Sequence, residues 1–246
     1  MAQASDISAN DATNQNAINH ALVIGASGGV GAGFVDALAA QGVATTPLSR
    51  AHDGFDITDA NSIEQTAKRF LDAGQTFDLI IVASGILDVR RDDGSVDGPE
   101  KSFHALDADN AMRAFAVNAL GPALVFKHFA QLMPARQRAV FVALSARVGS
   151  IGDNGLGGWM SYRASKAALN QFVRCASIEH QRRQVNHLVV AMHPGTLPTA
   201  LTEKYAKGRY TDDPSGAASR MLRVIHSLTP AQSGHFFAYD GTEIVW

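Results

Sequence analysis

The feature that most constrains the fold is a regular alternation of short, continuously apolar runs with longer segments whose apolar residues recur at helical spacing. Runs that are apolar at successive positions are typical of strands covered on both faces, and such strands separated by helices indicate a parallel sheet. We therefore predict an α/β fold with a doubly wound parallel sheet and helices on both faces. The expected strands are 21–26, 43–49, 77–84, 139–145, 185–195 and 234–241, and the expected helices are 29–41, 59–73, 108–133, 161–180 and 214–228.

Two of these elements contain a proline that should disturb them. Pro47 lies in the second strand, where the missing amide proton predicts an interruption. Gly121 and Pro122 lie inside the helix 108–133, so we expect a kink or a local break there. The helix 59–73 has Thr58 or Asp59 in position to cap its first turn.

The length of 246 residues fits one large domain or two small ones, and we expect a single domain at residues 19–246. Residues 1–18 are polar, lack the basic start and apolar core of a secretory signal, and have the composition of a flexible extension. The formal net charge of −2 gives no reason to expect nucleic acid, and no apolar run is long enough to cross a bilayer. Cys175 is the only cysteine, and the alanines around it predict a buried, inert thiol, in keeping with a cytoplasmic protein.

The first strand ends in the glycine-rich stretch GASGGVG, residues 25–31, with a G-x-x-x-G-x-G spacing. Glycines let the backbone approach a pyrophosphate, and the N-terminus of the helix that follows favours negative charge. The alternative is a tight turn with no ligand. Because the stretch joins the first strand to the first helix, we favour a nucleotide site and a single-domain Rossmann-like fold. The residues expected to hold the nucleotide are Gly25, Ser27, Gly28, Gly29, Val30 and Gly31.

The second strand ends at Ser49 and Arg50. Dinucleotide folds that select NAD place an acidic residue near this point for the ribose 2′-hydroxyl, whereas an arginine suits the 2′-phosphate of NADP. The pair therefore favours NADP(H), with NAD(H) possible, and the alternative is a solvated surface arginine.

Small and polar residues follow two further elements. Asp56 and Ile57 precede a helix, where Asp56 either caps a turn or contacts the adenine. The third strand ends in Ala83, Ser84 and Gly85, which leave room for a ribose. In parallel sheets ligands bind beyond the carboxyl ends of the strands, so these positions are candidate cofactor contacts.

The last two candidate strand ends are also polar. Ser145 ends the strand 139–145 and either caps a turn or orients a substrate carbonyl. His193 closes the strand 185–195 and is expected to pack or cap rather than to catalyse. The cofactor contacts expected after it are Pro194, Gly195, Thr196 and Thr199.

Tyr162 and Lys166 lie four residues apart at the start of the helix 161–180, so they share one face. A free phenol has a pKa of about 10, and an ammonium close by favours the phenolate. Tyr162 could then exchange a proton near neutral pH. Alone, the pair also fits an ordinary surface helix.

Together these segments resemble the short-chain dehydrogenases/reductases. GASGGVG (25–31), VNALGP (117–122), Ser145 followed by SYRASK (161–166), and HPGTLPT (193–199) occur in that family's order and spacing, and the resemblance runs from about residue 20 to the C-terminus. Within the family, DGPEKSFHALD (97–107) and GGWMSYRASKAALN (157–170) resemble the subgroup of C-factor and the sniffer-like carbonyl reductases.

The resemblance implies a catalytic tetrad. Asn118 would hold a water in a proton relay, and Ser145 would hydrogen-bond the carbonyl oxygen. Tyr162 would donate and accept the proton. Lys166 would bind the nicotinamide ribose and lower the pKa of Tyr162. Asn118, Tyr162 and Lys166 would thus also contact the cofactor, and the resemblance implies no metal.

The chain departs from the family pattern in three ways. The family usually has NNAG where this chain has Val82-Ala83-Ser84-Gly85, so two asparagines are lost. Gly28 stands where NADP-preferring members often carry a basic residue, and Ile24 replaces a threonine that braces the glycine loop.

These patterns predict an NAD(P)-dependent oxidoreductase that reduces a small-molecule carbonyl or oxidises the alcohol, with NADPH favoured. The alternative is a nucleotide-binding signalling or regulatory protein with incidental or no turnover. Relatives of this kind pair through the helices 108–133 and 161–180, so we expect a homodimer or homotetramer. The loops 86–104 and 196–213 should shape the substrate site, and Tyr205 and Tyr210 either line an apolar pocket or pack the second loop.

Overall fold

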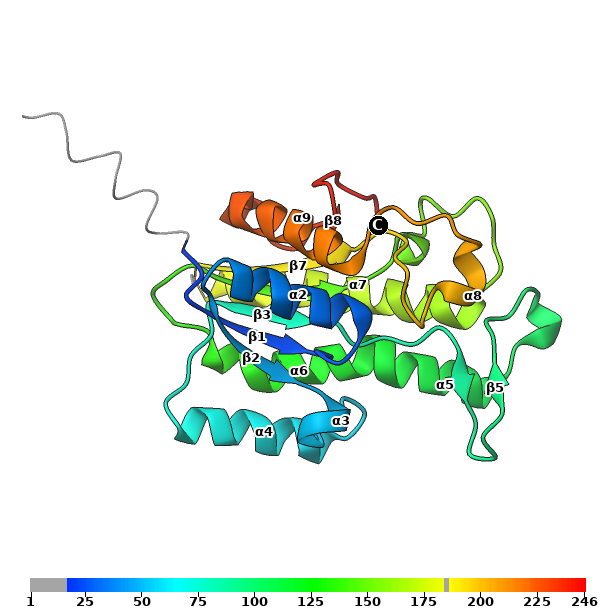
Figure 1. The fold of residues 1–246 in the computed structure, drawn as a ribbon, viewed down its shortest axis with the longest axis horizontal. Helices are drawn as coiled ribbons and strands as arrows, with labels where there is room; N and C mark the ends of the chain where they lie inside the picture. The colour runs from blue at the N-terminus through cyan, green and yellow to red at the C-terminus, as the bar shows by residue number, and fades with distance from the viewer. Residues whose placement is uncertain (1–16, 184–185) are drawn as a thin grey trace, which may run out of the picture.

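The computed structural model describes residues 17–183 and 186–246, and its centre is a six-stranded, wholly parallel sheet (Figure 1). The predicted α/β fold is confirmed. In spatial order the strands are β2 (Ala44–Leu48), β1 (His20–Ile24), β3 (Leu79–Val82), β6 (Ala139–Leu144), β7 (His187–His193) and β8 (Phe236–Ala238).

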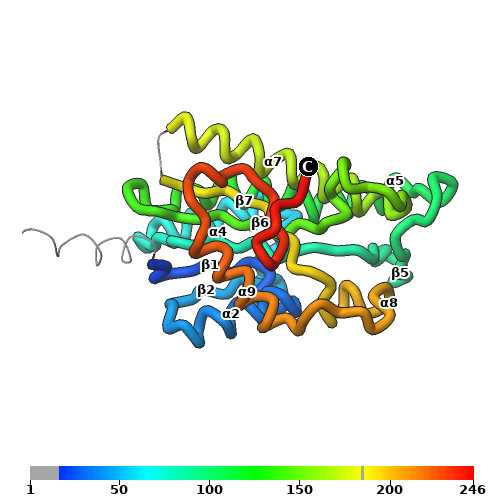
Figure 2. Tube along the Cα trace, turned by 90° about the horizontal axis from the view of Figure 1, so that it is seen from above, coloured from blue at the N-terminus to red at the C-terminus, as the bar shows by residue number. Residues whose placement is uncertain are grey.

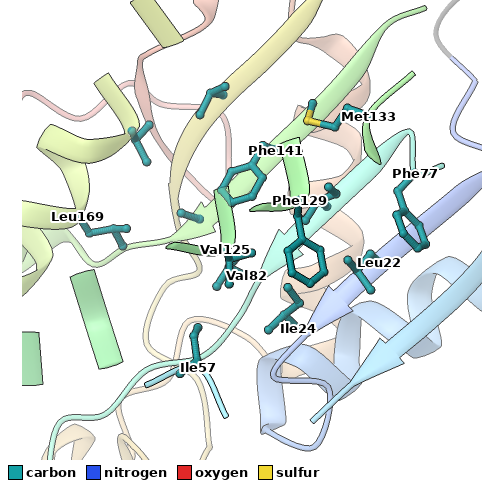
Figure 3. Close-up of a cluster of buried hydrophobic side chains, with 14 of the residues drawn as sticks. Leu22, Ile24, Ile57, Phe77, Val82, Val125, Phe129, Met133, Phe141 and Leu169 are labelled. Carbon is teal, nitrogen blue, oxygen red and sulfur yellow. The ribbon is translucent and has the colours of Figure 1, made fainter. Parts of the chain in front are cut away.

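Helices cover both faces of the sheet, as the continuously apolar strands require. Neighbouring residues of β3 point to opposite sides: Ile80 and Val82 join one buried cluster, whereas Leu79 and Ile81 join the other. The first cluster includes residues of α4 (Ala60–Asp72), α6 (Gly121–Phe129) and α7 (Met160–Arg182), and part of it is drawn in Figure 3. The second packs against α2 (Gly29–Ala40) and α9 (Pro214–Ser227), which lie across the sheet from α7 in Figure 2.

The expected break in the helix 108–133 is present. The chain runs from α5 (Ala108–Phe115) through a π-helical turn, η2 (Ala116–Leu120), into α6 and the 3₁₀ turn η3 (Ala130–Leu132). The amide of Gly121 bonds to the carbonyl of Ala116, five residues back. Pro122 has no amide proton to offer the carbonyl of Asn118, so regular α-helical bonding cannot continue through this turn.

The interruption expected at Pro47 is wrong, because this residue pairs with Val23 inside β2. β2 is an edge strand, and its residues alternate between the β1 side and solvent. The amide of Ala44 and the carbonyl of Leu48 both bond toward β1, so Pro47 faces outward. An outward-facing position on an edge strand needs no amide proton.

Several short elements were not predicted. They are α3 (Arg50–Asp53), β4 (Val89–Arg90), β5 (Val96–Asp97), η1 (Phe103–Ala105), η4 (Arg147–Gly149), α8 (Glu203–Ala206) and η5 (Pro230–Gln232). β4 and β5 form an antiparallel hairpin, which an ion pair of 3.3 Å between Arg91 and Asp107 ties to the start of α5. Both views place this hairpin and α8 at the end of the molecule toward which the parallel strands run (Figures 1 and 2).

Two predictions, on the N-terminal extension and on Cys175, need correction. The predicted extension 1–18 lies almost wholly outside the described residues, but Ile18 is buried against the core and belongs to the packed domain. Cys175 is exposed, not buried. The buried positions of α7 include Leu169 and Val173, and two further residues turn the helix by about 200°, which carries Cys175 to the other side. Within 17–183 and 186–246, no helix has the length and apolar character to span a membrane.

Candidate active site

The predicted nucleotide loop lies between β1 and α2, at the carboxyl end of the sheet. The amide of Gly25 donates to the carbonyl of Leu48 at 2.8 Å, and the amide of Gly28 donates to the carbonyl of Gly25 at 3.0 Å. Gly25 has φ +85°, a conformation that side chains disfavour, and a Cβ on Gly31 would lie only 2.1 Å from the Gly25 oxygen. Only glycine therefore fits these two positions. Ser27, Gly28 and Gly29 are exposed and Val30 is partly exposed, which leaves the backbone open to a ligand.

The loop after β7 is distant from the glycine loop in the sequence but lies next to it in the fold. A Cβ on Gly29 would lie 2.7 Å from the Thr199 methyl group, so the two loops are in contact. Thr196 holds the same loop, because its carbonyl accepts from the amide of Thr211 at 2.8 Å. Pro194 and Gly195 are partly exposed at the strand end. The structure thus brings two predicted cofactor segments together.

Ser49 and Arg50 begin the short helix α3. The Ser49 hydroxyl accepts from the amide of His52 at 3.2 Å and is buried, so it caps this helix. Arg50 is exposed in the first turn, and its charge helps hold the pKa of Asp56 below the usual range. The larger cause is the Thr58 hydroxyl, which donates to the Asp56 carboxylate at 2.7 Å.

Asp56 is therefore a turn cap, one of the two roles expected for it. It accepts from both the amide and the hydroxyl of Thr58, just before α4. The side chain of Ile57 is buried in the core cluster shown in Figure 3, so it presents no side-chain surface to a ligand.

The end of β3 contacts both the glycine loop and the helix face that carries Tyr162. A Cβ on Gly25 would lie 2.8 Å from the amide nitrogen of Ser84 and 3.0 Å from the carbonyl carbon of Ala83. A Cβ on Gly85 would lie 3.5 Å from the Lys166 ammonium. The strand end that departs from the family pattern is therefore still the meeting point of the predicted cofactor and catalytic residues.

Asn118 lies in the π-helical turn and is fully buried. Its side-chain oxygen accepts from the amide of Ile86 at 2.8 Å, and its side-chain nitrogen donates to the Ile86 carbonyl at 2.9 Å. The nitrogen also lies 3.1 Å from the Ser165 hydroxyl oxygen. The side chain thus joins the turn to the loop after β3 and to α7.

Ser145 follows β6 and is 4 % exposed. Its hydroxyl donates to the side-chain oxygen of Asn170 at 2.7 Å, and the Asn170 nitrogen donates to the carbonyl of Gly149 at 3.3 Å. The Ser145 proton is therefore held by α7, while the oxygen keeps its lone pairs.

Tyr162 and Lys166 lie one turn apart on α7 and are 8 % and 4 % exposed. The Lys166 ammonium donates to the carbonyl of Leu144 at 2.9 Å, which brings α7 against the end of β6. The reading of this pair as an ordinary surface helix is excluded by their burial.

The expected lowering of the Tyr162 pKa does not occur in this structure. Burial raises the pKa of Tyr162 to about 12 and lowers the pKa of Lys166 to about 8. Both shifts have one cause, because a buried site penalises the charged form of each group. At pH 7 the phenol is neutral and the ammonium is charged.

His193 is partly buried at the end of β7, and burial lowers its pKa to about 4, so it is neutral. Within the described ranges its Nδ1 has no hydrogen-bond partner. This agrees with the packing role expected for it.

Sequence reasoning missed Ser165 and Asn170. Both are buried on α7 and hydrogen-bond to predicted catalytic residues. The available signal was their place three and eight residues after Tyr162, where polar side chains interrupt the apolar stripe of the helix.

Comparison with known proteins agrees with this geometry. The family model for short chain dehydrogenases matches residues 19–209. 1-Hydroxy-2-glutathionyl-2-methyl-3-butene dehydrogenase of Rhodococcus sp. is 31 % identical over 209 residues, which cover 85 % of this chain and 83 % of that protein. C-signal of Myxococcus xanthus is 37 % identical over 67 % of this chain and 96 % of its own length.

Solved structures confirm the fold. The carbonyl reductase Sniffer of D. melanogaster superimposes with a TM-score of 0.78 at 20 % identity, covering 94 % of this chain and all of that one. The NADPH-bound carbonyl reductase from chicken fatty liver gives a TM-score of 0.76 at 23 % identity, over 93 % and 94 % of the two chains. The similarity to C-signal supports the predicted resemblance to the C-factor subgroup, and the Sniffer structure shares the fold. The chain belongs to the short-chain dehydrogenase family of oxidoreductases, which act on CH–OH and C=O groups.

Proposed function

We propose that this protein is an NADPH-dependent reductase of carbonyl compounds, which also runs in reverse as an alcohol dehydrogenase. The observation that carries the proposal is the buried Tyr162–Lys166 pair, held against the end of β6 beside Ser145. A buried charge is costly unless it is paired and hydrogen-bonded, and strongly perturbed titratable groups concentrate at functional sites. A neutral phenol buried on the same helix face as an ammonium suits proton transfer.

The roles of the residues follow from the chemistry of hydride addition. A bound reduced nicotinamide would supply the hydride, and negative charge would then develop on the carbonyl oxygen. Tyr162 would donate its proton to that oxygen, and the Lys166 charge would stabilise the phenolate left behind. The Ser145 hydroxyl would turn from Asn170 to the same oxygen. The Asn118 carbonyl, which Pro122 cannot satisfy, suits a water that returns a proton through Lys166.

The glycine loop supports a dinucleotide as the cofactor. A Cβ would fill the cradle at Gly25 and Gly31, and the exposed backbone from Ser27 to Gly29 opens at the N-terminus of α2. Arg50 supports NADPH over NADH because it is exposed at the end of β2, where a 2′-phosphate would lie. The NADPH bound to the chicken carbonyl reductase agrees with this preference.

The cofactor is tested by titrating the protein with NADPH and, separately, NADH, following nicotinamide fluorescence. We expect tighter NADPH binding, weakened about tenfold in Arg50→Ala with NADH binding unchanged. Arg136→Ala is the matched control, since Arg136 is exposed just before the amino end of β6. Equal affinity for the two cofactors would contradict the role of Arg50.

The chemistry is tested with Tyr162→Phe. This variant keeps the ring and its packing but loses the acid, so carbonyl reduction should fall at least 100-fold while NADPH still binds. The alternative function, a nucleotide-binding regulatory protein, gains support from the similarity to C-signal. If cells that carry Tyr162→Phe keep the phenotype that depends on this protein although carbonyl reduction is lost, the regulatory function is supported and the enzymatic one is contradicted.

A further inference from the structure

Three aromatic rings from two segments, the start of α7 and the loop after β7, form a row that begins at Tyr162. The ring of Trp159 lies 6.3 Å from the ring of Tyr162 and 5.3 Å from the ring of Tyr205, with edge-to-face angles of 68° and 69°. Tyr205 belongs to α8, in the loop after β7, whereas Trp159 immediately precedes α7. Both rings are partly buried. The row therefore extends from the proposed acid to the loop that should shape the substrate site.

Trp159 is held in this place by its backbone. Its φ of +54° is unusual for a bulky residue, and its amide donates to the carbonyl of Glu100 at 2.5 Å. The Glu100 carboxylate is itself buried and accepts from both the amide and the hydroxyl of Ser161. Strained backbone of this kind persists where the surroundings fix it, and such positions concentrate at functional sites.

Tyr205 is held by Asp88, which follows β3. The Tyr205 hydroxyl donates to one carboxylate oxygen of Asp88, and the Lys204 ammonium pairs with the other. Burial and the Asp88 carboxylate raise the pKa of the Tyr205 phenol, so it stays neutral. Gly98 leaves room for this hydroxyl, because a Cβ there would lie 2.8 Å from it.

Asp88 thereby engages the side chains of Lys204 and Tyr205, two of the polar residues of α8. Two arginines near Tyr162 in the sequence have hydrogen-bond partners elsewhere: Arg163 donates to the carbonyls of Gly158 and Val148, and Arg147 pairs with Asp153 at 3.3 Å. Besides the Lys166 ammonium, which donates to the carbonyl of Leu144, the side-chain surface described next to Tyr162 is the Trp159 ring. This arrangement suits an apolar group and does not favour a carboxylate.

Building on the proposed carbonyl reduction, we propose that Trp159 and Tyr205 determine substrate specificity. They form an aromatic wall that begins at the Tyr162 ring, and the substrate is a carbonyl compound that carries a planar apolar group, such as an aryl aldehyde or ketone. Asp88 acts as a positioning residue, since it holds the Tyr205 ring in the wall and neutralises Lys204.

The first test compares benzaldehyde with propanal as substrates under NADPH. The wild type should prefer benzaldehyde in kcat/KM, and Trp159→Ala should reduce this preference about tenfold, mainly through KM. Trp159→Phe should keep most of the preference for benzaldehyde. Tyr205→Leu should lose that preference, because it removes the second aromatic ring of the wall. The affinity for NADPH should stay within twofold in each variant, which also shows that the variants fold.

The second test uses 4-carboxybenzaldehyde, whose carboxylate the wild type should disfavour against benzaldehyde. Asp88→Ala frees Lys204, so its kcat/KM ratio for the carboxylated over the plain aldehyde should rise about tenfold. Asp92→Ala is the matched control, because Asp92 pairs with Arg113 and is 90 % exposed.

The outcomes separate this inference from the function on which it rests. An active wild type whose aryl preference is unchanged in Trp159→Ala and Tyr205→Leu overturns the aromatic wall. An unchanged ratio in Asp88→Ala overturns the role of Asp88. A wild type that reduces no carbonyl compound, although it binds NADPH, overturns the proposed reductase function itself.

Discussion

At the scale of one residue, the buried charge of Lys166 serves the proposed chemistry but lowers the stability of the folded protein. The residue is 4 % exposed, and its ammonium donates to the carbonyl of Leu144. Burial lowers its pKa from 10.5 to about 8, which corresponds to about 3 kcal/mol of cost for holding the charge at pH 7. The fold tolerates this cost at the position where a charge is needed.

Replacing the charge should therefore stabilise the protein. We expect Lys166→Met to unfold at a higher temperature than the wild type at pH 7 and to lose carbonyl reduction. Between about pH 8 and 10.5 the unfolded wild-type chain binds the proton that the folded chain has released, so wild-type stability rises with pH relative to the variant. The difference in melting temperature should narrow over this range. A difference that stays constant from pH 7 to 10 would contradict the buried charge.

Residue identities were predictable at the site, but their surroundings were not. The strand-end rule and the four-residue spacing selected Ser145, Tyr162 and Lys166 from the sequence. The contact between Ser145 and Asn170, and the direction of the Tyr162 pKa shift, depend on how α7 packs against β6. Packing of this kind brings together residues that are far apart in the chain, so local sequence patterns do not predict it.

At the scale of elements, the turn from β1 to α2 depends on one close contact. A Cβ on Gly31 would lie 2.1 Å from the Gly25 oxygen, whereas a Cβ on Gly28 would lie 3.4 Å from the same atom. Gly31→Ala should therefore cost about 2 kcal/mol or more and lower the melting temperature by roughly 5 °C. Gly28→Ala is the control and should melt close to the wild type. Equal melting temperatures for the two variants would contradict the close contact.

The elements that the sequence predicted best have a clear apolar pattern, which is continuous in β6 and helically spaced in α7. The strand β6 and the helix α7 were expected at 139–145 and 161–180 and are found at Ala139–Leu144 and Met160–Arg182. The hairpin of β4 and β5 has only two residues in each strand, too few to show alternation. Pro47 was misjudged because its effect depends on the place of β2 in the sheet, which local propensity does not specify.

At the scale of the whole molecule, an open groove of about 390 Å³ lies between α6 and α7. The groove is lined by Phe126, Phe172, Val173 and Ala176, among others. The Phe172 residue is 42 % exposed. Exposed apolar surface along two helices suits a helical interface, in keeping with the homo-oligomer predicted from sequence.

Light scattering at micromolar concentration tests this prediction, and we expect the mass of a dimer or tetramer. Phe172→Glu should shift the mass toward one chain, because it places a charge in the apolar interface. Leu71→Glu is the control, since Leu71 is 48 % exposed on α4. A single-chain mass for the wild type would rule out the interface.

The outward-facing Pro47 bears on how copies of this protein can associate. A sheet grows from chain to chain only when its outer strand offers a continuous row of amide protons and carbonyls. Pro47 removes a donor from that row on β2, and on the other side Phe237 of β8 bridges to Glu243 of the same chain. With both borders of the sheet closed in this way, assembly by strand addition is disfavoured, and contact between copies is left to the helices.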